Sequence, residues 1–335
     1  MPPTRVASPV SVAAPGKLFV LGEYAVLCGG PALVTTVKRR VHLASRHDSE
    51  GYQIRGAKFD DVLHLPLTIR QVLRDEEDLD VDLNALTLDV SEFYEDGVKM
   101  GLGSSAASTV AVISAAAPHL PAWRRFELAW EIHHRFQGGV GSGADIAAST
   151  FGGTLAYHLR APEPPFDSIK LRGIRFQDTV STTRAIIAPN LVLPEGVRVD
   201  AVWTGAPASS VSFVQRLRAH LEEQPRSTEA ILQSIAARAR TDIKAVEQND
   251  AQSFIDSVRR ADRAMEQLGA LTGLPIITDT HRRLRALGQT TGLVAKPSGA
   301  GGGDFTLLVG PRDSQILPSI TDDFTVVPVA SDANR

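Results

Sequence analysis

The sequence has few of the residues that mark secreted, membrane-embedded or zinc-stabilised proteins. Its 335 residues include a single cysteine, Cys28, which excludes an intrachain disulfide and a zinc site built from several cysteines. A chain without disulfides is typical of a reducing compartment. No apolar run approaches the roughly 18 residues that a membrane-spanning helix needs, and none of signal-peptide length follows the N-terminus. We therefore expect a cytoplasmic protein.

An excess of charge of one sign is also lacking. The chain has 35 basic and 38 acidic side chains, so its formal net charge is −3. This balance provides no basic field for binding nucleic acid or an anionic membrane. Hydrophobic residues make up 43 % and charged residues 22 %, which is the composition of an ordinary globular protein. We expect the ligand to be a small molecule held in a local site. The sequence leaves the oligomeric state open between a monomer and a homodimer.

The length and the hydrophobic patterns indicate two α+β domains. At 335 residues the chain is long for one compact core. We place the boundary near residue 190, between an N-terminal domain of residues 1–190 and a C-terminal domain of residues 191–335. Pro15 and Gly16 are expected to separate the first two strands. Alternation and helical spacing predict strands at 6–14, 18–21, 31–45, 86–90, 154–157, 197–203, 292–295 and 305–309, and helices at 65–73, 104–117, 123–136, 144–150, 210–221, 228–248 and 251–268.

A glycine loop leads directly into a predicted helix near residue 100. The segment reads Lys99-Met100-Gly101-Leu102-Gly103-Ser104-Ser105-Ala106-Ala107. Glycines let the backbone approach an anion closely, and the free amides of a helix N-terminus favour negative charge. The two serine hydroxyls add hydrogen-bond donors or a magnesium ligand. The spacing is neither that of a Walker A loop nor that of a dinucleotide-binding fingerprint. A simple helix cap would leave the lysine and both glycines without a role.

Two further glycine-bearing segments carry potential binding groups. Residues 296–304 read Lys-Pro-Ser-Gly-Ala-Gly-Gly-Gly-Asp. Four glycines in five positions cost backbone entropy that a plain hairpin connection does not require. Residues 14–24 read Ala-Pro-Gly-Lys-Leu-Phe-Val-Leu-Gly-Glu-Tyr, which places one lysine and one acid near strand ends. This last segment is a weak signal by itself, because such residues are common at strand rims.

Together the three segments resemble, in order and spacing, the signature motifs of the GHMP kinase superfamily, which contains galactokinase, homoserine kinase, mevalonate kinase and phosphomevalonate kinase. The resemblance covers nearly the whole chain. It implies an N-terminal domain like ribosomal protein S5 domain 2 and a ferredoxin-like C-terminal domain, with the active site between them. It also implies that ATP and Mg²⁺ are bound, that the loop at Ser104 and Ser105 holds the ATP phosphates, and that residues 298–303 close over the substrate.

A fourth segment narrows the resemblance within the superfamily. Residues 133–147 read His-His-Arg-Phe-Gln-Gly-Gly-Val-Gly-Ser-Gly-Ala-Asp-Ile-Ala. This segment is similar to phosphomevalonate kinases, whereas mevalonate kinases usually show Asn-Pro-Ser-Gly-x-Asp-Asn. Two further segments agree with this resemblance. Gly22-Glu23-Tyr24 replaces the Gly-Glu-His that is typical of mevalonate kinases, and residues 203–209 resemble a phosphomevalonate kinase segment. The resemblance implies an ATP-dependent phosphomevalonate kinase that converts 5-phosphomevalonate to 5-diphosphomevalonate in the mevalonate pathway of isoprenoid biosynthesis.

The resemblance also assigns roles to individual residues. Lys17 is expected to stabilise the transferring phosphoryl group, and Asp145 to orient the acceptor phosphate. From residue type alone, a helix-terminal role for Asp145 is about as common. Ser105 is the expected magnesium ligand, and a second protein contact to the ion stays open. ATP phosphates are expected at Lys99, Gly101, Leu102, Gly103, Ser104, Ser105 and Ala106. The substrate is expected at Glu23, Tyr24, Ser142, Gly143, Ser209, Lys296, Ser298, Gly299, Ala300, Gly301 and Gly302.

Other functions stay open from the sequence. A mevalonate kinase would phosphorylate an alcohol and depend more on Asp145 as a base. A diphosphomevalonate decarboxylase-type relative shares the phosphate loop, and a non-catalytic relative would only bind a small molecule. His133 and His134 have no partner at metal-ligand spacing, so we predict packing or surface roles for them.

Overall fold

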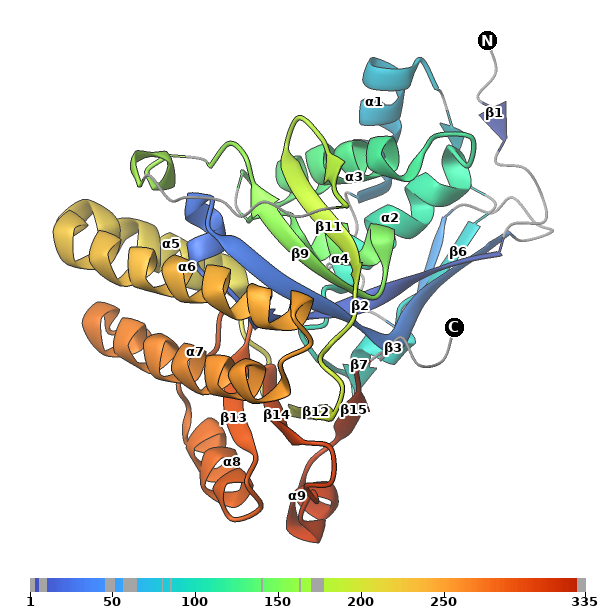
Figure 1. The fold of residues 1–335 in the computed structure, drawn as a ribbon. Helices are drawn as coiled ribbons and strands as arrows, with labels where there is room; N and C mark the ends of the chain where they lie inside the picture. Colours follow the sequence, from blue (N-terminus) through green and yellow to red (C-terminus); the bar gives the residue numbers. More distant parts are fainter. Residues whose placement is uncertain are drawn as a thin grey trace.

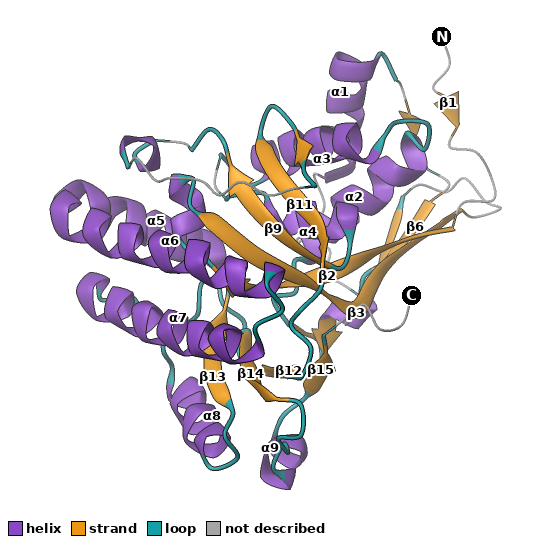
Figure 2. Ribbon diagram, viewed as in Figure 1, coloured by secondary structure: helices purple, strands orange, loops and turns teal. Residues whose placement is uncertain are grey.

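The computed structural model describes residues 4–5, 11–45, 52–56, 65–79, 81–84, 86–139, 141–162, 164–169 and 178–329. Within these residues the chain forms two large β-sheets with helices packed against them (Figure 1). Strands run through the middle of the molecule, and helices flank them on several sides (Figure 2). The architecture is α+β, as predicted.

The larger sheet belongs to the N-terminal half of the chain. Its strands are β2 (Ser11–Leu21), β3 (Pro31–Ser45), β4 (Gln53–Arg55), β6 (Leu86–Asp89), β9 (Thr154–Leu159), β10 (Val180–Ser181) and β11 (Ala185–Leu191). Their order is β10-β11-β9-β3-β6-β4, with β2 paired to β3. Two short pairs lie apart from it, β1 (Thr4–Arg5) with β5 (Val81–Asp82), and β7 (Tyr94–Glu95) with β8 (Val98–Lys99).

Alanine-rich helices cover this sheet at close range. The helices of this half are α1 (Leu65–Glu77), α2 (Ser104–Ala116), α3 (Ala122–Phe136) and α4 (Ala144–Phe151). Both α2 and α4 pack against β2 and β3, and α3 packs on α2. Ala106, Ala107 and Ala111 of α2 are fully buried. Because these side chains are small, the N-terminal end of α2 lies close to the strands beneath it.

The smaller sheet has the predicted ferredoxin-like arrangement. Its strands are β12 (Val197–Trp203), β13 (Val294–Ser298), β14 (Phe305–Pro311) and β15 (Val326–Pro328), in the antiparallel order β13-β14-β12-β15. The helices of this half are α5 (Ser210–Glu223), α6 (Pro225–Glu247), α7 (Ala251–Thr272), α8 (Asp279–Gln289) and α9 (Pro318–Asp323). Helices follow the first and third of these strands, which is the β-α-β-β-α-β chain order of that fold.

We propose that the domain boundary lies where the chain passes from one sheet to the other. This position is close to residue 190, where the sequence predicts it. Strand β11 ends at Leu191 in the larger sheet, and β12 begins at Val197 in the smaller one. Helix α6 nevertheless packs against β3, so helices of the C-terminal half also cover part of the N-terminal sheet.

The prediction of two strands separated by Pro15 and Gly16 is wrong. Strand β2 continues from Ser11 to Leu21, and its register against β3 shifts between Pro15 and Lys17. Such a bulge tolerates proline, because its residues leave the ladder of hydrogen bonds. At the bulge, the Lys17 amide donates to the carbonyl of Leu102 at 2.9 Å. Residues 6–10 of the predicted first strand lie outside the described residues.

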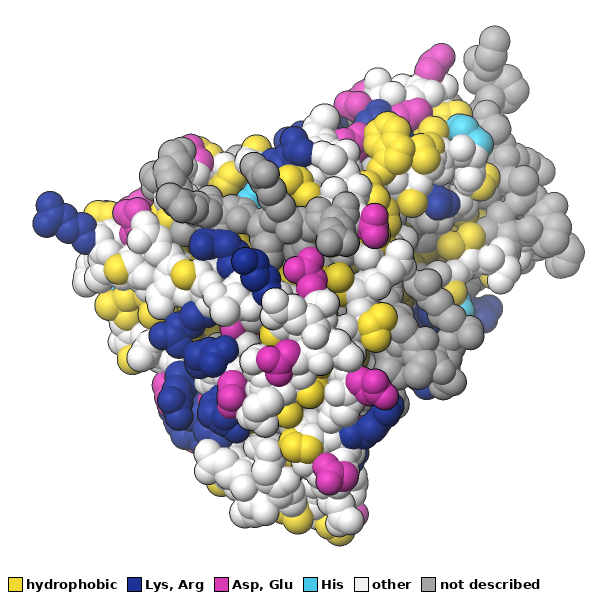
Figure 3. All heavy atoms as spheres, in the orientation of Figure 1, with side chains coloured by type: hydrophobic (Ala, Val, Ile, Leu, Met, Phe, Trp, Pro, Cys, Tyr) yellow, Lys and Arg dark blue, Asp and Glu magenta, His cyan; other side chains and the backbone are white. Residues whose placement is uncertain are grey.

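The surface over α6 and α7 carries both signs of charge. Lys and Arg side chains gather there, beside Asp and Glu side chains (Figure 3). Arg260 pairs with Asp242 at 3.0 Å, for example. In the described part of the chain, no helix combines the length and apolar character of a membrane span.

A buried ion pair joins the two halves of the chain. The ammonium of Lys296, on β13, contacts the carboxylate of Glu23, which follows β2. Lys296 is 0 % exposed and Glu23 is 3 % exposed. The Lys296 ammonium also donates to the carbonyl of Pro297 at 2.7 Å. Removing one partner of such a pair leaves an uncompensated charge in the interior, which is strongly destabilising.

Glu23→Ala should therefore lower the free energy of unfolding by about 3–5 kcal/mol, because the Lys296 ammonium stays buried without its counter-ion. Denaturant unfolding followed by circular dichroism measures this loss. The matched control is Asp323→Asn, which breaks the exposed pair with Arg283 and should cost less than about 1 kcal/mol. Equal losses in the two variants would contradict the structural role of the buried pair.

Candidate active site

One pocket is lined by side chains from both halves of the chain. Its volume is about 270 Å³, near the lower end for small-molecule sites. The predicted site residues that line it are Lys17, Glu23, Tyr24, Lys99, Gly101, Gly103, Ser104, Ser105, Ser142, Asp145, Ser209, Gly299 and Ala300. All four sequence segments therefore meet at one place.

The glycine loop turns from β8 into α2 in a conformation that favours glycine. The φ angles of Gly101 and Gly103 are +84° and +81°, in the left-handed region. Between them, the Leu102 carbonyl accepts the hydrogen bond from Lys17 in the β2 bulge. The N-cap of α2 is Gly103, which has no side chain to bond the first helical amides. These amides are available to an anion in the pocket.

Lys17 and Asp145 both lie close to the second glycine of the loop. A Cβ atom placed on Gly103 would lie 3.4 Å from Cε of Lys17 and 3.8 Å from Cβ of Asp145. The lysine comes from β2 and the aspartate from the first turn of α4. The structure thus brings the two together at the start of α2, and their catalytic roles stay predictions.

The alternative role of Asp145, at the end of a helix, accounts for one of its contacts. Oδ1 accepts a hydrogen bond from the amide of Ile146 at 3.0 Å. The N-cap of α4, however, is Gly143 and not Asp145. Within the described residues no hydrogen bond engages Oδ2. One oxygen is anchored to the helix, and the other is left for a ligand.

His133 holds the hydroxyl of Ser105, a contact that sequence reasoning missed. Nε2 of His133 lies 3.0 Å from Oγ of Ser105. Burial lowers the pKa of His133, the nearby cations add to this effect, and Asp145 opposes it. The imidazole is therefore neutral near pH 7, and in the tautomer protonated on Nδ1 its Nε2 accepts a hydrogen bond from the serine hydroxyl. The histidine is buried, as a packing residue would be, but its contact reaches the predicted magnesium ligand.

The glycine hairpin between β13 and β14 brings the C-terminal half to the pocket. Gly299 and Ala300 line the pocket, and the Tyr24 hydroxyl donates to the Ala300 carbonyl at 2.5 Å. Asp304, which ends the hairpin, also lines the pocket. No role was predicted for Asp304, although it directly follows the glycine motif. Ser209 lines the pocket as the N-cap of α5, and its hydroxyl accepts from the Ser212 amide at 3.3 Å.

Lys296 and Ser298, for which a contact with substrate was predicted, are not among the residues that line the pocket. The Lys296 ammonium is fully buried and is neutralised by Glu23. The Ser298 hydroxyl donates to the carbonyl of Phe19 at 2.9 Å. Both side chains therefore connect the two halves of the chain instead of facing a ligand.

Five other predicted contact residues also support the pocket without lining it. Leu102, in the loop, and Ala106, in α2, have buried side chains, while neighbouring residues of the same segments line the pocket. The remaining three are glycines whose missing side chains make room for other residues. These pairs are Gly143 with Trp130, Gly301 with Ile276, and Gly302 with Phe213.

Mg²⁺ fits this pocket as an ion held mainly by a nucleotide. The Ser105 hydroxyl lines the pocket at the start of α2, and Asp145 lines the same pocket. Among the described residues, no three His, Cys, Asp or Glu side chains form a metal-binding cluster. Mg²⁺ commonly takes one or two protein ligands and completes its shell with phosphate oxygens and water. The donors present suit that mode of binding.

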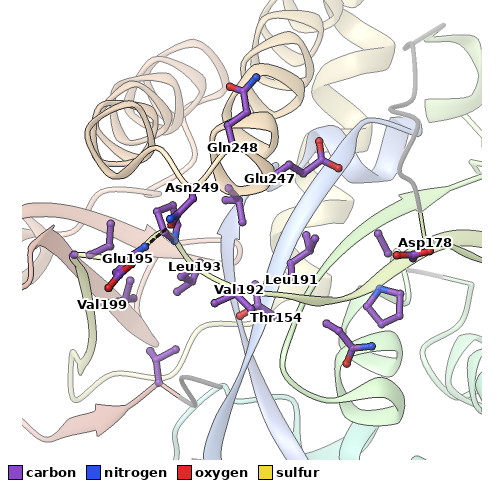
Figure 4. Close-up of a pocket in the computed structure, with 18 of the residues that line it drawn as sticks. Thr154, Asp178, Leu191, Val192, Leu193, Glu195, Val199, Glu247, Gln248 and Asn249 are labelled. Carbon is purple, nitrogen blue, oxygen red and sulfur yellow. Dashed lines mark hydrogen bonds between the residues drawn. The ribbon is translucent and has the colours of Figure 1, made fainter. Parts of the chain in front are cut away.

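A larger hollow elsewhere on the surface contains none of the predicted site residues. It is lined by the segment that joins β11 to β12 and by the end of α6 (Figure 4). Across it, the Glu195 amide donates to Oδ1 of Asn249 at 2.6 Å. Arg198 and Arg312 are among its lining residues, but neither the glycine loop nor Lys17 nor Asp145 is. The smaller pocket is therefore the candidate for phosphoryl transfer.

Comparisons with known proteins agree with this assignment. Residues 79–153 match the family model for the GHMP kinases N terminal domain. The chain is 33 % identical to the phosphomevalonate kinase of a Streptomyces species, with 87 % of each chain covered. It is 25 % identical to the mevalonate kinase of Thermococcus gammatolerans, with 93 % and 92 % covered. Its fold matches the Streptococcus pneumoniae phosphomevalonate kinase in complex with phosphomevalonate and AMPPNP, with a TM-score of 0.70, 21 % identity, and 93 % and 94 % covered.

A glycine loop at a helix N-terminus, with a lysine and an aspartate beside it, suits phosphoryl transfer to a small molecule, and the relatives named above are kinases of that class. The chain belongs to the GHMP kinase superfamily. Of the two curated relatives named above, the phosphomevalonate kinase shares more of its sequence than the mevalonate kinase does. The resemblance predicted from the motifs is confirmed.

Ser105→Ala should raise the Mg²⁺ concentration needed for half-maximal activity by about tenfold, the scale of one lost hydrogen-bonding ligand. Activity measured against free Mg²⁺ at saturating ATP tests this. The matched control is Ser108→Ala, one turn further along α2, whose buried hydroxyl has no hydrogen-bond partner among the described residues. If Ser105→Ala and Ser108→Ala show the same Mg²⁺ dependence as the unmodified enzyme, Ser105 does not bind the ion.

Proposed function

We propose that the protein is an ATP-dependent phosphomevalonate kinase. The observation that carries this proposal is the position of Lys17 and Asp145 close to Gly103, in the pocket where α2 begins. The 33 % identity to a phosphomevalonate kinase supports the choice of acceptor. The product would be 5-diphosphomevalonate, an intermediate of isoprenoid biosynthesis by the mevalonate pathway.

The acceptor is a phosphate monoester, which limits what the enzyme must supply. The second pKa of such a group is about 6, so its oxygen is largely deprotonated at pH 7. This oxygen attacks the γ-phosphorus, and the bond from that phosphorus to the β–γ bridging oxygen breaks. ADP leaves with the bridging oxygen. Because little is required of a base, positioning and charge neutralisation provide most of the rate.

The residues of the pocket divide this work between donor and acceptor. The amides at the start of α2 and the Lys99 ammonium would hold the donor phosphates. The Lys17 ammonium would neutralise charge on the group in transfer. Asp145 would accept a hydrogen bond from the acceptor phosphate when that group carries a proton, and so orient it. The hydroxyls of Ser142 and Ser209, which line the pocket, would bind the acceptor.

Mg²⁺ bound through Ser105 would neutralise charge on the nucleotide phosphates. His133 would keep the Ser105 oxygen directed at the pocket by accepting a hydrogen bond from its hydroxyl. The binding of Mg²⁺, the cytoplasmic location, and a monomeric or homodimeric state remain predictions of this proposal.

The acceptor is tested by a coupled assay of ADP release, offering 5-phosphomevalonate and mevalonate separately. We expect kcat/KM for 5-phosphomevalonate to exceed that for mevalonate by at least about 10³-fold, because the pocket would lose its charge-assisted contacts to the phosphate. Mass spectrometry of the product should show the added phosphate without loss of carbon dioxide. Faster turnover of mevalonate would overturn the proposed acceptor, and loss of carbon dioxide would indicate a decarboxylase.

A further inference from the structure

Asp304 is held rigidly at the end of the glycine hairpin, and the chemistry above gives it no role. Its φ angle is +52°, in the left-handed region where aspartate is among the few tolerated side chains. Its amide donates to the Ala206 carbonyl at 2.7 Å, and its carbonyl accepts from the Thr204 amide at 2.9 Å. The Ala208 amide donates to Oδ1 of its carboxyl at 2.9 Å. The carboxyl is therefore in place before any ligand binds.

The Asp304 carboxyl lies directly against the phosphate-binding loop of the other half of the chain. A Cβ atom on Gly101 would lie 2.3 Å from each of its two oxygens. The carboxyl also lines the pocket beside the start of α2. Within the described part of the chain, no hydrogen bond engages its Oδ2 atom. One oxygen is anchored, and the other is left for a group in the pocket.

Two lysines face this carboxyl without forming an ion pair with it. Burial raises the pKa of Asp304 to about 6, while the Ala208 amide, Lys17 on β2 and Lys99 on β8 lower it. No ion pair joins either lysine to a carboxylate among the residues described. Burial is therefore the largest influence, and it holds the pKa of this carboxyl above its usual range.

The charge balance of the pocket changes when a phosphorylated ligand enters. The cations that line the pocket are Lys17 and Lys99. The other carboxylates that line it are Asp145 and Glu23, and Glu23 is already paired. Each bound phosphate adds up to two negative charges. An ionised Asp304 beside a phosphate would be repelled, whereas a neutral carboxyl could donate its proton in a hydrogen bond.

We propose that Asp304 takes up a proton when a phosphorylated ligand binds and donates a hydrogen bond from its carboxyl to a phosphate oxygen. The proton comes from solvent and returns to it when the product leaves, so the reaction itself stays balanced. A buried carboxylic acid kept neutral so that it can donate is a known arrangement in enzyme sites. The inference rests on the proposed function, because it requires that phosphates occupy this pocket.

The phosphate in contact could belong to the nucleotide or to the acceptor, and calorimetry distinguishes the two. AMPPNP and 5-phosphomevalonate are titrated separately into the unmodified enzyme and D304N at pH 7, in two buffers of different ionisation enthalpy. The ligand that Asp304 contacts should bind the unmodified enzyme with uptake of about one proton more than D304N takes up. The asparagine amide keeps a donor at this place but does not titrate, and proton changes of the ligand itself cancel in the difference.

The pH dependence of affinity provides a second measurement that needs no variant. Between pH 7 and 8, Kd of the contacted ligand should rise by up to about tenfold for the unmodified enzyme, as one bound proton requires. In D304N, Kd of the same ligand should rise less over this pH range, and the difference between the two enzymes should equal that factor. The matched control, D313N, changes an exposed acid outside the pocket and should behave as the unmodified enzyme does.

Equal proton uptake by the unmodified enzyme and D304N with both ligands would overturn the inference. So would a loss of more than about 100-fold in affinity in D304N, since that marks a carboxylate needed in its charged form, such as one that binds a cation. The AMPPNP titration does not depend on which acceptor the enzyme uses. A wrong acceptor would therefore appear in the ADP-release assay while the nucleotide result still reports on Asp304.

Discussion

The hydrogen bond from the Lys17 amide to the Leu102 carbonyl is the contact on which the site depends. It connects the bulge in β2 to the glycine loop at 2.9 Å, so one backbone contact places both the lysine and the start of α2. The approach requires Gly16, because a Cβ atom there would lie 2.9 Å from the Phe93 ring and 3.0 Å from the Leu102 oxygen. The irregularity of β2 therefore positions the chemistry.

The site is completed only when the two halves of the chain meet. Several contacts between described residues join them around the pocket, among them the buried Lys296–Glu23 pair, the Tyr24 hydroxyl on the Ala300 carbonyl, and the Asp304 carboxyl against Gly101. Each links the hairpin of the C-terminal half to a segment of the N-terminal half. Stability and binding are therefore coupled, because the ion pair that holds the halves together lies next to the groups that face the ligand.

The sequence predicted the meeting of the segments better than the direction of individual side chains. The glycine loop, Lys17 and Asp145 could be placed because their motifs have recognisable order and chemistry. The burial of Lys296 could not, because its partner Glu23 lies far away in the sequence and only the packed sheets show which way the lysine points. Likewise, the contact of Ser105 with His133 depends on how α2 packs on α3. The β2 bulge was misread because Pro15 and Gly16 usually end strands.

The central proposal is that Lys17 and Asp145 act together in one phosphoryl transfer, Lys17 on the transferring group and Asp145 on the acceptor phosphate. A double-mutant cycle tests it most directly. Single-turnover phosphoryl transfer is measured for Asp145→Asn, Lys17→Met and the double variant, with AMPPNP affinity measured in parallel. We expect Asp145→Asn to slow transfer by about 100-fold or more, with nucleotide affinity largely kept. The double variant should be far less impaired than the product of the single effects, because the two residues work as a unit. An unchanged rate in Asp145→Asn, or strictly multiplicative losses, would contradict the account.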